Sequence, residues 1–166
     1  MSYSTRILID GMNLMYKFPD LAFLLVEYKI HEARLGLLQY LWQYFQEQKA
    51  VEVLIFFDGR KSPWEDCYSE KYAEMSVHYS QEKKADELIM ACLTQSPIPS
   101  QCLVITSDKE IINFARRIRA KRKTSEEFYK EWTSHWDLQM ESEVDQIKEG
   151  VKEQTETEFW MKQFLR

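Results

Sequence analysis

Apolar positions along the chain follow two patterns that alternate. Short continuous apolar runs, which predict buried strands, cover residues 6–10, 51–57 and 102–106, and a weaker run covers residues 76–79. Apolar residues at helical spacing predict amphipathic helices over residues 30–48, from near 81 to 95, and over 109–118. Because strands alternate with helices, the pattern predicts an α/β fold built from parallel βαβ units.

Turn and capping residues predict a turn, a loop and the start of a further helix. Gly11-Met12-Asn13 predicts a turn after the first strand, and the polar stretch that follows Asp58 predicts a loop. Thr124-Ser125-Glu126-Glu127 matches a capping box, in which the Thr hydroxyl and the Glu carboxylate satisfy free N–H groups at a helix start. We expect a helix from there through Trp132.

Residues 138–166 predict an appended helix. Met140, Val144, Ile147 and Val151 recur at helical spacing within a mostly acidic segment. Gly150 costs a helix about 1 kcal/mol relative to Ala, so a break in the tail would fall there. The apolar stripe favours packing on the chain's own domain, with a contact to another protein as the alternative.

Composition limits the class of protein. The chain has 166 residues, of which 45% are hydrophobic and 14% aromatic, and this predicts a folded globule. Three cysteines without CxxC spacing predict neither a disulfide framework nor a zinc site and favour a reducing cytoplasm. The sequence opens without a signal-peptide pattern, and its longest apolar run is far below the ~20 residues that span a bilayer. We expect a cytoplasmic protein without a membrane segment.

Aspartates mark the ends of the three strong strands. Asp10, Asp58 and Asp108 stand at or just after those ends, and Asp86 lies near the start of a predicted helix. A parallel sheet brings the carboxyl ends of its strands to one edge, where open α/β sheets bind ligands. Two carboxylates about 4 Å apart repel by about 4 kcal/mol. Mg²⁺ or Mn²⁺ would offset this repulsion, so the pattern predicts a metal site.

Four short motifs contain these acids in the order that a known family has them. They read Ile7-Leu8-Ile9-Asp10-Gly11-Met12-Asn13, Phe56-Phe57-Asp58-Gly59, Lys84-Ala85-Asp86-Glu87-Leu88-Ile89 and Ile105-Thr106-Ser107-Asp108. With these motifs the chain resembles the YacP-like branch of the NYN domains, which belong to the PIN-like nucleases. The resemblance spans residues 6 to about 132. It implies a Rossmann-like three-layer sandwich with a mostly parallel sheet and a metal-dependent endoribonuclease activity.

The resemblance also implies roles for single residues. Asp10, Asp58, Asp86 and Asp108 would bind Mg²⁺ or Mn²⁺, and Asn13 and Ser107 would stand beside them in the catalytic site. Residues 1–136 would form the nuclease domain, and 137–166 a helical tail for which the resemblance offers no counterpart. Lys121-Arg122-Lys123 stands where the family has an apolar last strand, so we expect a short basic edge strand that contacts RNA.

Basic residues predict a surface for RNA although the net charge is −5. From Lys109 to Lys123 there are seven basic residues and one acidic residue, and a local basic stripe matters more than the total charge. The expected partner is RNA, free or presented by a ribosome or another ribonucleoprotein. The candidate RNA contacts are Arg60, Lys61, Lys83, Lys84, Arg116, Arg117, Arg119, Lys121, Arg122 and Lys123.

Each candidate residue also has a purely structural interpretation. Asp10 and Asp108 can cap the helices that follow them, and an acid such as Asp86 suits the positive end of a helix dipole. Runs of basic residues are often solvated faces. Taken singly, Asp10 favours capping, Asp108 fits a cap and a site equally, and Asp86 depends mainly on the resemblance, whereas the acids together favour a site.

Three functions are compatible with these features. The first is a metal-dependent endoribonuclease that hydrolyses phosphodiester bonds in single-stranded or loop RNA. The second is an RNA- or ribonucleoprotein-binding module of the same fold with weak or lost catalysis. The third, a small-molecule phosphohydrolase or phosphoacceptor domain, ranks last because Asp-x-Asp is absent at Asp10 and neither GxxxxGK[ST] nor GxGxxG occurs.

Overall fold

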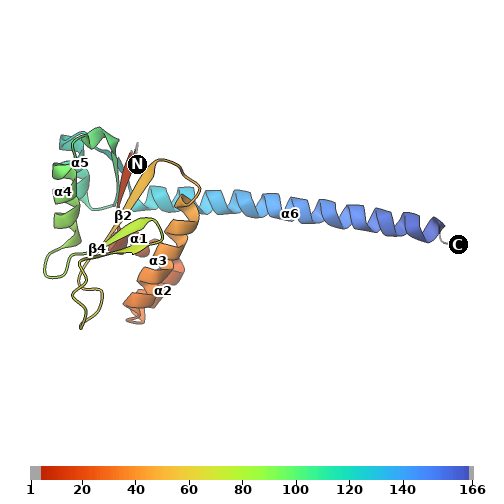
Figure 1. Ribbon diagram of the computed structural model, residues 1–166, viewed down its shortest axis with the longest axis horizontal. Coiled ribbons are helices and arrows are strands. Elements are labelled where there is room, and N and C mark those ends of the chain that lie inside the picture. Colours follow the sequence, from red (N-terminus) through yellow and green to blue (C-terminus); the bar gives the residue numbers. More distant parts are fainter. Residues whose placement is uncertain (1–4, 165–166) are drawn as a thin grey trace. The chain divides into compact units, whose positions relative to one another are not determined.

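A single sheet of mostly parallel strands organises the domain. The computed structural model describes residues 5–164, with side chains for residues 5–150 (Figure 1). The strand order is β3-β4-β2-β1-β5-β6, and β3 pairs antiparallel with β4 while the other pairs are parallel. The strands are β1 (Thr5–Asp10), β2 (Val51–Phe57), β3 (Ser69–Tyr72), β4 (Met75–Tyr79), β5 (Cys102–Ile105) and β6 (Lys121–Lys123).

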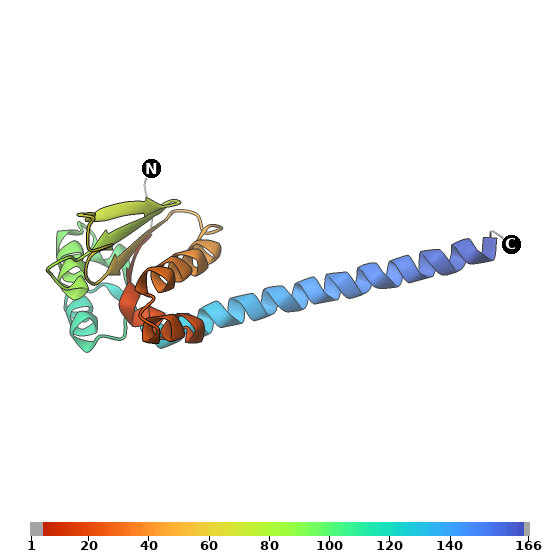
Figure 2. The ribbon, with the colours of Figure 1, turned by 90° about the horizontal axis from the view of Figure 1, so that it is seen from below.

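Helices cover both faces of this sheet, as Figures 1 and 2 show. Helices α4 and α5 lie on one face, and α1, α2 and α3 lie on the other. The predicted α/β three-layer sandwich is therefore confirmed. The helices are α1 (Gly11–Met15), α2 (Pro19–Val26), α3 (Ile30–Phe45), α4 (Ala85–Gln95), α5 (Lys109–Arg117) and α6 (Ser125–Phe164), with a short 3₁₀ turn, η1 (Pro99–Gln101).

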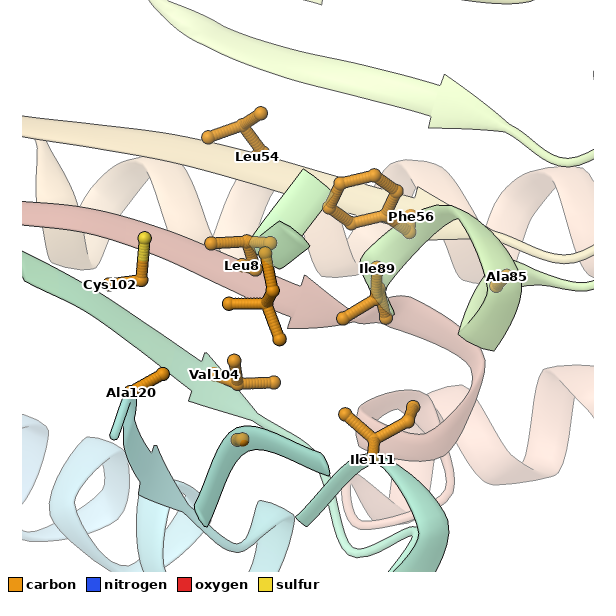
Figure 3. Packing of buried hydrophobic residues seen from close by; sticks show 11 residues of the cluster. Leu8, Leu54, Phe56, Ala85, Ile89, Cys102, Val104, Ile111 and Ala120 are labelled. Carbon is orange, nitrogen blue, oxygen red and sulfur yellow. The ribbon is translucent and has the colours of Figure 1, made fainter. Parts of the chain in front are cut away.

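Alternation along the central strands explains the three layers. Successive side chains of a strand point to opposite faces, and both faces of β1 are buried. Leu8, Leu54 and Val104 belong to a cluster with Ile89 of α4 and Ile111 of α5, which Figure 3 shows from close by. Burial on both sides fixes the sheet's register and, with it, the positions at which the strands end.

Two boundaries differ from the sequence predictions. The turn predicted at residues 11–13 is the first part of helix α1, because the chain enters the helix directly from β1. Helix α4 begins at Ala85 instead of near Gln81. Gln81 has a left-handed φ of 56° and Lys84 is extended, and neither conformation belongs to an α-helix.

Strand β3 and helix α2 were not predicted. Strand β3 has the sequence Ser-Glu-Lys-Tyr, and its side chains are at most half-buried. This polar edge strand forms because its backbone pairs with β4. Its side chains show no apolar pattern from which a strand could have been predicted. The remaining strands and helices of residues 5–129 lie close to the predicted ranges.

Gly11 allows helix α1 to approach β2 closely, and its replacement makes a direct test. A Cβ at Gly11 would lie 2.5 Å from Cε1 of the buried Phe57 ring and 3.0 Å from the Phe56 carbonyl oxygen. We expect Gly11→Ala to lower the free energy of unfolding by about 1–3 kcal/mol through overpacking, measured by urea denaturation. Gly150→Ala is the matched control, because nothing lies within 4 Å and alanine favours a helix there. Equal stabilities of the two variants would contradict the prediction.

Helix α6 begins as the capping box predicts. The backbone N–H of Glu127 donates to Thr124 Oγ1 at 3.1 Å, and the N–H of Thr124 donates to Glu127 Oε2 at 3.4 Å. The helix continues without interruption through Gly150 to Phe164, so the described residues contain no break at Gly150.

The chain divides into two compact units, residues 1–129 and 130–166. The described part of the second unit is the continuation of α6. Within the part of the chain that the structure covers, every helix is either too short or too polar to cross a membrane. Whether the tail's apolar stripe packs on the chain's own domain or contacts another protein stays a prediction.

Candidate active site at the carboxyl ends of the strands

Three of the four candidate aspartates stand at the carboxyl ends of neighbouring strands. Strand β1 lies between β2 and β5 and is parallel to both, so the ends of all three meet at one edge. Asp10 is the last residue of β1, Asp58 directly follows β2, and Asp108 stands just beyond β5. Asp10 is therefore the central acid of the group.

Asp10 is buried, with 8% of its surface exposed. Its Oδ2 accepts a hydrogen bond of 2.9 Å from the Thr106 hydroxyl. Burial raises the pKa of Asp10 to about 6; the Thr106 bond opposes this shift, and the charges of Asp58 and Asp108 add to it. The charges of Asp58 and Asp108 thus both act on the Asp10 carboxyl group.

Asp58 ties the end of β2 to the start of α4. Its Oδ1 accepts a hydrogen bond of 2.8 Å from the backbone N–H of Ala85, the first residue of that helix. The next residue is Asp86, which lies in the first turn of α4 and is partly exposed. The structure therefore brings Asp86 to the neighbourhood of Asp58 through a backbone contact.

Asp108 caps helix α5, as the structural interpretation predicts. Its Oδ1 accepts hydrogen bonds from the N–H groups of Glu110 at 2.8 Å and Ile111 at 3.3 Å. Its own N–H donates to Thr106 Oγ1 at 3.0 Å, so the Thr106 hydroxyl connects Asp108 with Asp10. Both capping bonds use Oδ1, which leaves Oδ2 for a different role.

A polar network joins Asn13 and Ser107 to the start of α6. Asn13 Oδ1 accepts from the Ser107 N–H at 2.9 Å and from the Ser125 hydroxyl at 2.6 Å. The Ser107 hydroxyl donates to Glu126 and accepts from the Ser125 N–H at 3.0 Å. Because its oxygen is used in this way, Asn13 can offer its amide N–H₂ to a bound group.

Glu126 in this network is ionised and paired. Its carboxylate lies 2.5 Å from the Lys17 ammonium group. Lys17 and the Ser107 hydroxyl lower the pKa of Glu126 to about 2. Lys17, which follows α1, and Glu126, in the first turn of α6, thus lie beside the sheet edge that carries Asp10, Asp58 and Asp108. We call this edge the aspartate edge.

Arg34 supports the turn that carries Asp58. The residue is 5% exposed, and its guanidinium group donates to the carbonyl oxygens of Asp58 at 2.5 Å and Arg60 at 2.7 Å. It also lies over the rings of Phe57 and Tyr79, at 5.2 and 5.4 Å from their centroids. Burial lowers its pKa. A buried cation therefore holds the turn after β2 through two of its backbone carbonyl oxygens.

Sequence reasoning missed four residues that the structure places at or beneath this edge: Thr106, Arg34, Lys17 and Glu126. Arg34 carried a usable signal, because it falls on the apolar face of α3, four residues after Ile30 and three before Leu37. The contacts of Lys17 and Glu126 join distant parts of the chain and have no local signal.

The basic candidates after β2 are paired with acids. Arg60 forms salt bridges of 2.8 Å with Asp66 and Glu82, and Lys61 forms one of 2.6 Å with Glu70. These pairs reduce the charge that Arg60 and Lys61 could present to RNA. Lys83 and Lys84, directly before α4, are exposed at the aspartate edge.

The basic residues of α5 and β6 lie mostly at the other end of the sheet. Helix α5 starts after Asp108 and returns towards the amino ends of the strands, where Lys121 pairs with Leu103 at the start of β6. The segment from the end of α5 to the start of β6 contains Arg116, Arg117, Arg119, Lys121 and Arg122. Lys123 pairs with Ile105, and its carbonyl accepts from the Thr106 N–H at 3.0 Å, so it lies nearer the aspartates.

The aspartate edge has the donor chemistry that Mg²⁺ or Mn²⁺ requires. Carboxylate, amide and hydroxyl oxygens are the ligands of hard divalent cations. Among the residues that the structure describes, no group of three or more Asp, Glu, His or Cys side chains lies close enough together to hold a metal ion directly. Magnesium usually keeps several waters and uses one or two carboxylates, so this arrangement fits a hydrated ion.

Fold and acidic edge together define a PIN-like protein of the nuclease type. The chain belongs to the YacP-like NYN domain family, whose model matches residues 7–165. This match includes the tail, for which sequence reasoning had found no counterpart.

Solved structures that resemble the chain include two of one bacterial protein. A mutant of Rae1 (YacP) from Bacillus subtilis is 25% identical with a TM-score of 0.66, over 87% of this chain and 84% of that one. Rae1 (YacP) itself is 24% identical with a TM-score of 0.63, over 99% and 92% of the two chains. No curated protein matches the chain. The family model thus establishes the family, and the solved structures support the fold.

Proposed function

We propose that this protein is a metal-dependent endoribonuclease that hydrolyses phosphodiester bonds in single-stranded or loop RNA. The observation that carries the proposal is the placement of Asp10, Asp58 and Asp108 at the carboxyl ends of neighbouring parallel strands, where burial and the charges of the other two acids raise the pKa of Asp10. Keeping an acid buried next to other acids costs stability, and a divalent ion would offset this cost. The nuclease-type family supports the proposal.

Asp10, Asp58, Asp86 and Asp108 would hold Mg²⁺ or Mn²⁺, directly or through waters. When bound, such an ion supplies an activated water and charge stabilisation for the scissile phosphate. The protein's contribution is to fix the acids: Thr106 holds Asp10 and Asp108 in place, and the Ala85 N–H holds Asp58.

Asn13 and Ser107 position the other side of the site. The Asn13 amide nitrogen can donate to a phosphate oxygen or to a water, because its oxygen is fixed by Ser107 and Ser125. Ser107 is held by Glu126, which is in turn held by Lys17. These contacts preorganise the donors before RNA binds.

Splayed single strands suit this edge better than a duplex. The deep major groove of A-form RNA is too narrow for side chains to read, whereas loop and single-stranded RNA can present its backbone at a sheet edge. Lys83 and Lys84 are exposed beside Asp86 and provide positive charge for that backbone.

An RNA-binding module without catalysis is the alternative function. It is favoured by the capping contacts of Asp58 and Asp108, because these contacts would preserve both acids for structural reasons. Product formation by a substoichiometric amount of protein separates the two functions, since a binding module gives no turnover.

The proposal is tested by an RNA-cleavage assay with Mg²⁺ or Mn²⁺ and the variants Asp86→Asn and Asp108→Asn. We expect cleavage by the wild-type protein, its loss on adding a chelator, and a reduction of at least about tenfold in each variant. Because Asp108→Asn keeps an oxygen to cap α5, circular dichroism should show a folded protein. Unchanged cleavage by both variants would refute the assignment of the site.

A further inference from the structure

A basic hollow lies away from the aspartate edge. It is a shallow depression of about 550 Å³ that is largely open to solvent. Its lining comes from the last turn of α5, the turn after it and the first residues of β6, and consists of Arg116, Arg119, Ala120, Lys121 and Arg122. We call these five residues the basic hollow.

The cations of the basic hollow are poorly neutralised. Its lining, within the described part of the chain, includes four cations and no acid. The side-chain bonds that these residues make are long and go to neutral groups: Arg116 to Asn113 at 3.4 Å, and Arg122 to the Ala120 carbonyl at 3.3 Å. By contrast, Arg60 is held by two carboxylates at 2.8 Å. Like charges gathered in this way favour a bound polyanion.

The polarity of the strands places the basic hollow at the opposite end of the sheet from Asp108. Strand β6 begins at Lys121, which pairs with Leu103 near the start of β5, whereas Asp108 follows the end of β5. Helix α5 connects the two ends with nine residues, which at 1.5 Å per residue amounts to about 13 Å. A group in the hollow therefore cannot be the group at the aspartates.

The chemistry of the hollow favours a phosphate backbone. Arginine presents a planar fork of N–H donors that matches a phosphate group, and three of the four cations are arginines. Repeated phosphates along one strand can occupy several of these cations at once, while acidic side chains on a protein surface rarely keep so regular a spacing.

We propose that the basic hollow is a docking site for the RNA backbone, separate from the site of cleavage. This inference rests on the proposed function and adds the substrate class to it: RNA long enough to reach both ends of the sheet. With about 3.4 Å per nucleotide, a stacked strand places about four nucleotides between the docked phosphate and the cleaved one, and a splayed strand needs fewer.

Binding tests the docking site independently of cleavage. The probe is a single-stranded RNA of about 20 nucleotides, several times the minimum span, bound to Asp108→Asn protein without divalent ions at a series of salt concentrations. We expect Arg116→Gln/Lys121→Gln in this background to weaken RNA binding at least about tenfold at low salt. The slope of log affinity against log salt should become shallower by about 1–2.

Two further variants make the result specific. Lys29→Gln/Lys49→Gln removes the same charge from exposed residues outside the hollow and should bind RNA as its parent does. Arg119 has a left-handed φ of 62°, a conformation that glycine adopts without strain, so Arg119→Gly removes one cation of the hollow at no cost in folding. We expect Arg119→Gly to weaken RNA binding while the melting temperature is maintained or raised.

Substrate length gives the second readout. In a background with all four aspartates, the hollow variant should raise the KM for the long RNA about tenfold more than the KM for a dinucleotide, whose single phosphodiester cannot be docked and cleaved at once. Equal affinity and salt slope in the hollow and control variants would overturn the docking site, whether or not RNA is cleaved. Loss of binding in the hollow variant without any cleavage by wild type would keep the docking site and reject the proposed nuclease activity.

Discussion

Replacing Asp10 by asparagine will abolish RNA cleavage and stabilise the protein at neutral pH. We expect a loss of activity of about a hundredfold or more, because even partners of metal ligands contribute 10–100-fold. The gain in stability follows from burial, since the Asp10 carboxylate is 8% exposed and its pKa is raised to about 6. Asparagine has nearly the same shape, accepts the Thr106 hydrogen bond and carries no charge.

The pH dependence of this stabilisation has a definite sign. Below about pH 4 the Asp10 carboxyl is protonated in the folded and the unfolded state, so its titration has no effect on stability. Between about pH 4 and 6 the folded protein holds this proton more tightly, and wild-type stability falls as the pH rises. Above about pH 6 the loss is complete, at up to about 3 kcal/mol for a shift of this size.

Urea denaturation of wild type and Asp10→Asn, at about pH 4 and about pH 7.5 without divalent ions, measures the effect. The variant should be the more stable protein only at the higher pH. Mg²⁺ should stabilise the wild type more than the variant, because a ligand stabilises the state that binds it. Asp145→Asn, at an exposed position of α6, is the control and should show neither effect. An inactive variant that is less stable at both pH values would show that Asp10 is primarily structural.

The location of the acids could be predicted because it depends on strand polarity alone. Once β1, β2 and β5 are recognised as parallel strands, the residues at their ends must share an edge. The residues that hold those acids in place could not be predicted. Thr106 contacts Asp10 across 96 positions of sequence, and Lys17, in the turn after α1, pairs with Glu126 of α6, so both contacts exist only in the folded chain.

The basic segment shows a different limit of the sequence analysis. We expected RNA-binding residues from Arg116 to Lys123 as one group, whereas the structure divides them between the two ends of the sheet. The direction of a βαβ connection implies this division: a helix that starts at the carboxyl end of one parallel strand must return to the amino end of the next. Charge alone therefore predicted a surface for RNA but gave no position for it.

Replacing Arg34 by leucine will destabilise the domain and weaken the site together. The substitution leaves the carbonyl oxygens of Asp58 and Arg60 without the donors that now lie at 2.5 and 2.7 Å. A polar group left unsatisfied away from water costs about 1–3 kcal/mol, and burying leucine in place of a cation offsets part of this cost. Because Asp58 is half-buried and Arg60 is exposed, water can replace part of the lost donors, and we expect a net loss of about 1–3 kcal/mol in the free energy of unfolding, measured by urea denaturation.

The effect of Arg34→Leu on cleavage separates positioning from stability. The turn after β2 is also held by the Gly59 N–H, which donates to Ser80 Oγ at 2.9 Å, so the folded variant should keep its overall course. Without Arg34, however, the backbone that carries Asp58 gains freedom, and kcat of the folded protein should fall about tenfold or more, as when other support of a metal ligand is removed. Cleavage is measured well below the melting temperature, with Gln39→Leu at an exposed position of the same helix as the control. If Arg34→Leu is destabilised but its folded fraction retains full kcat, Arg34 has only a structural role. The conservative variant Arg34→Lys should recover part of kcat if one carbonyl contact suffices to fix Asp58.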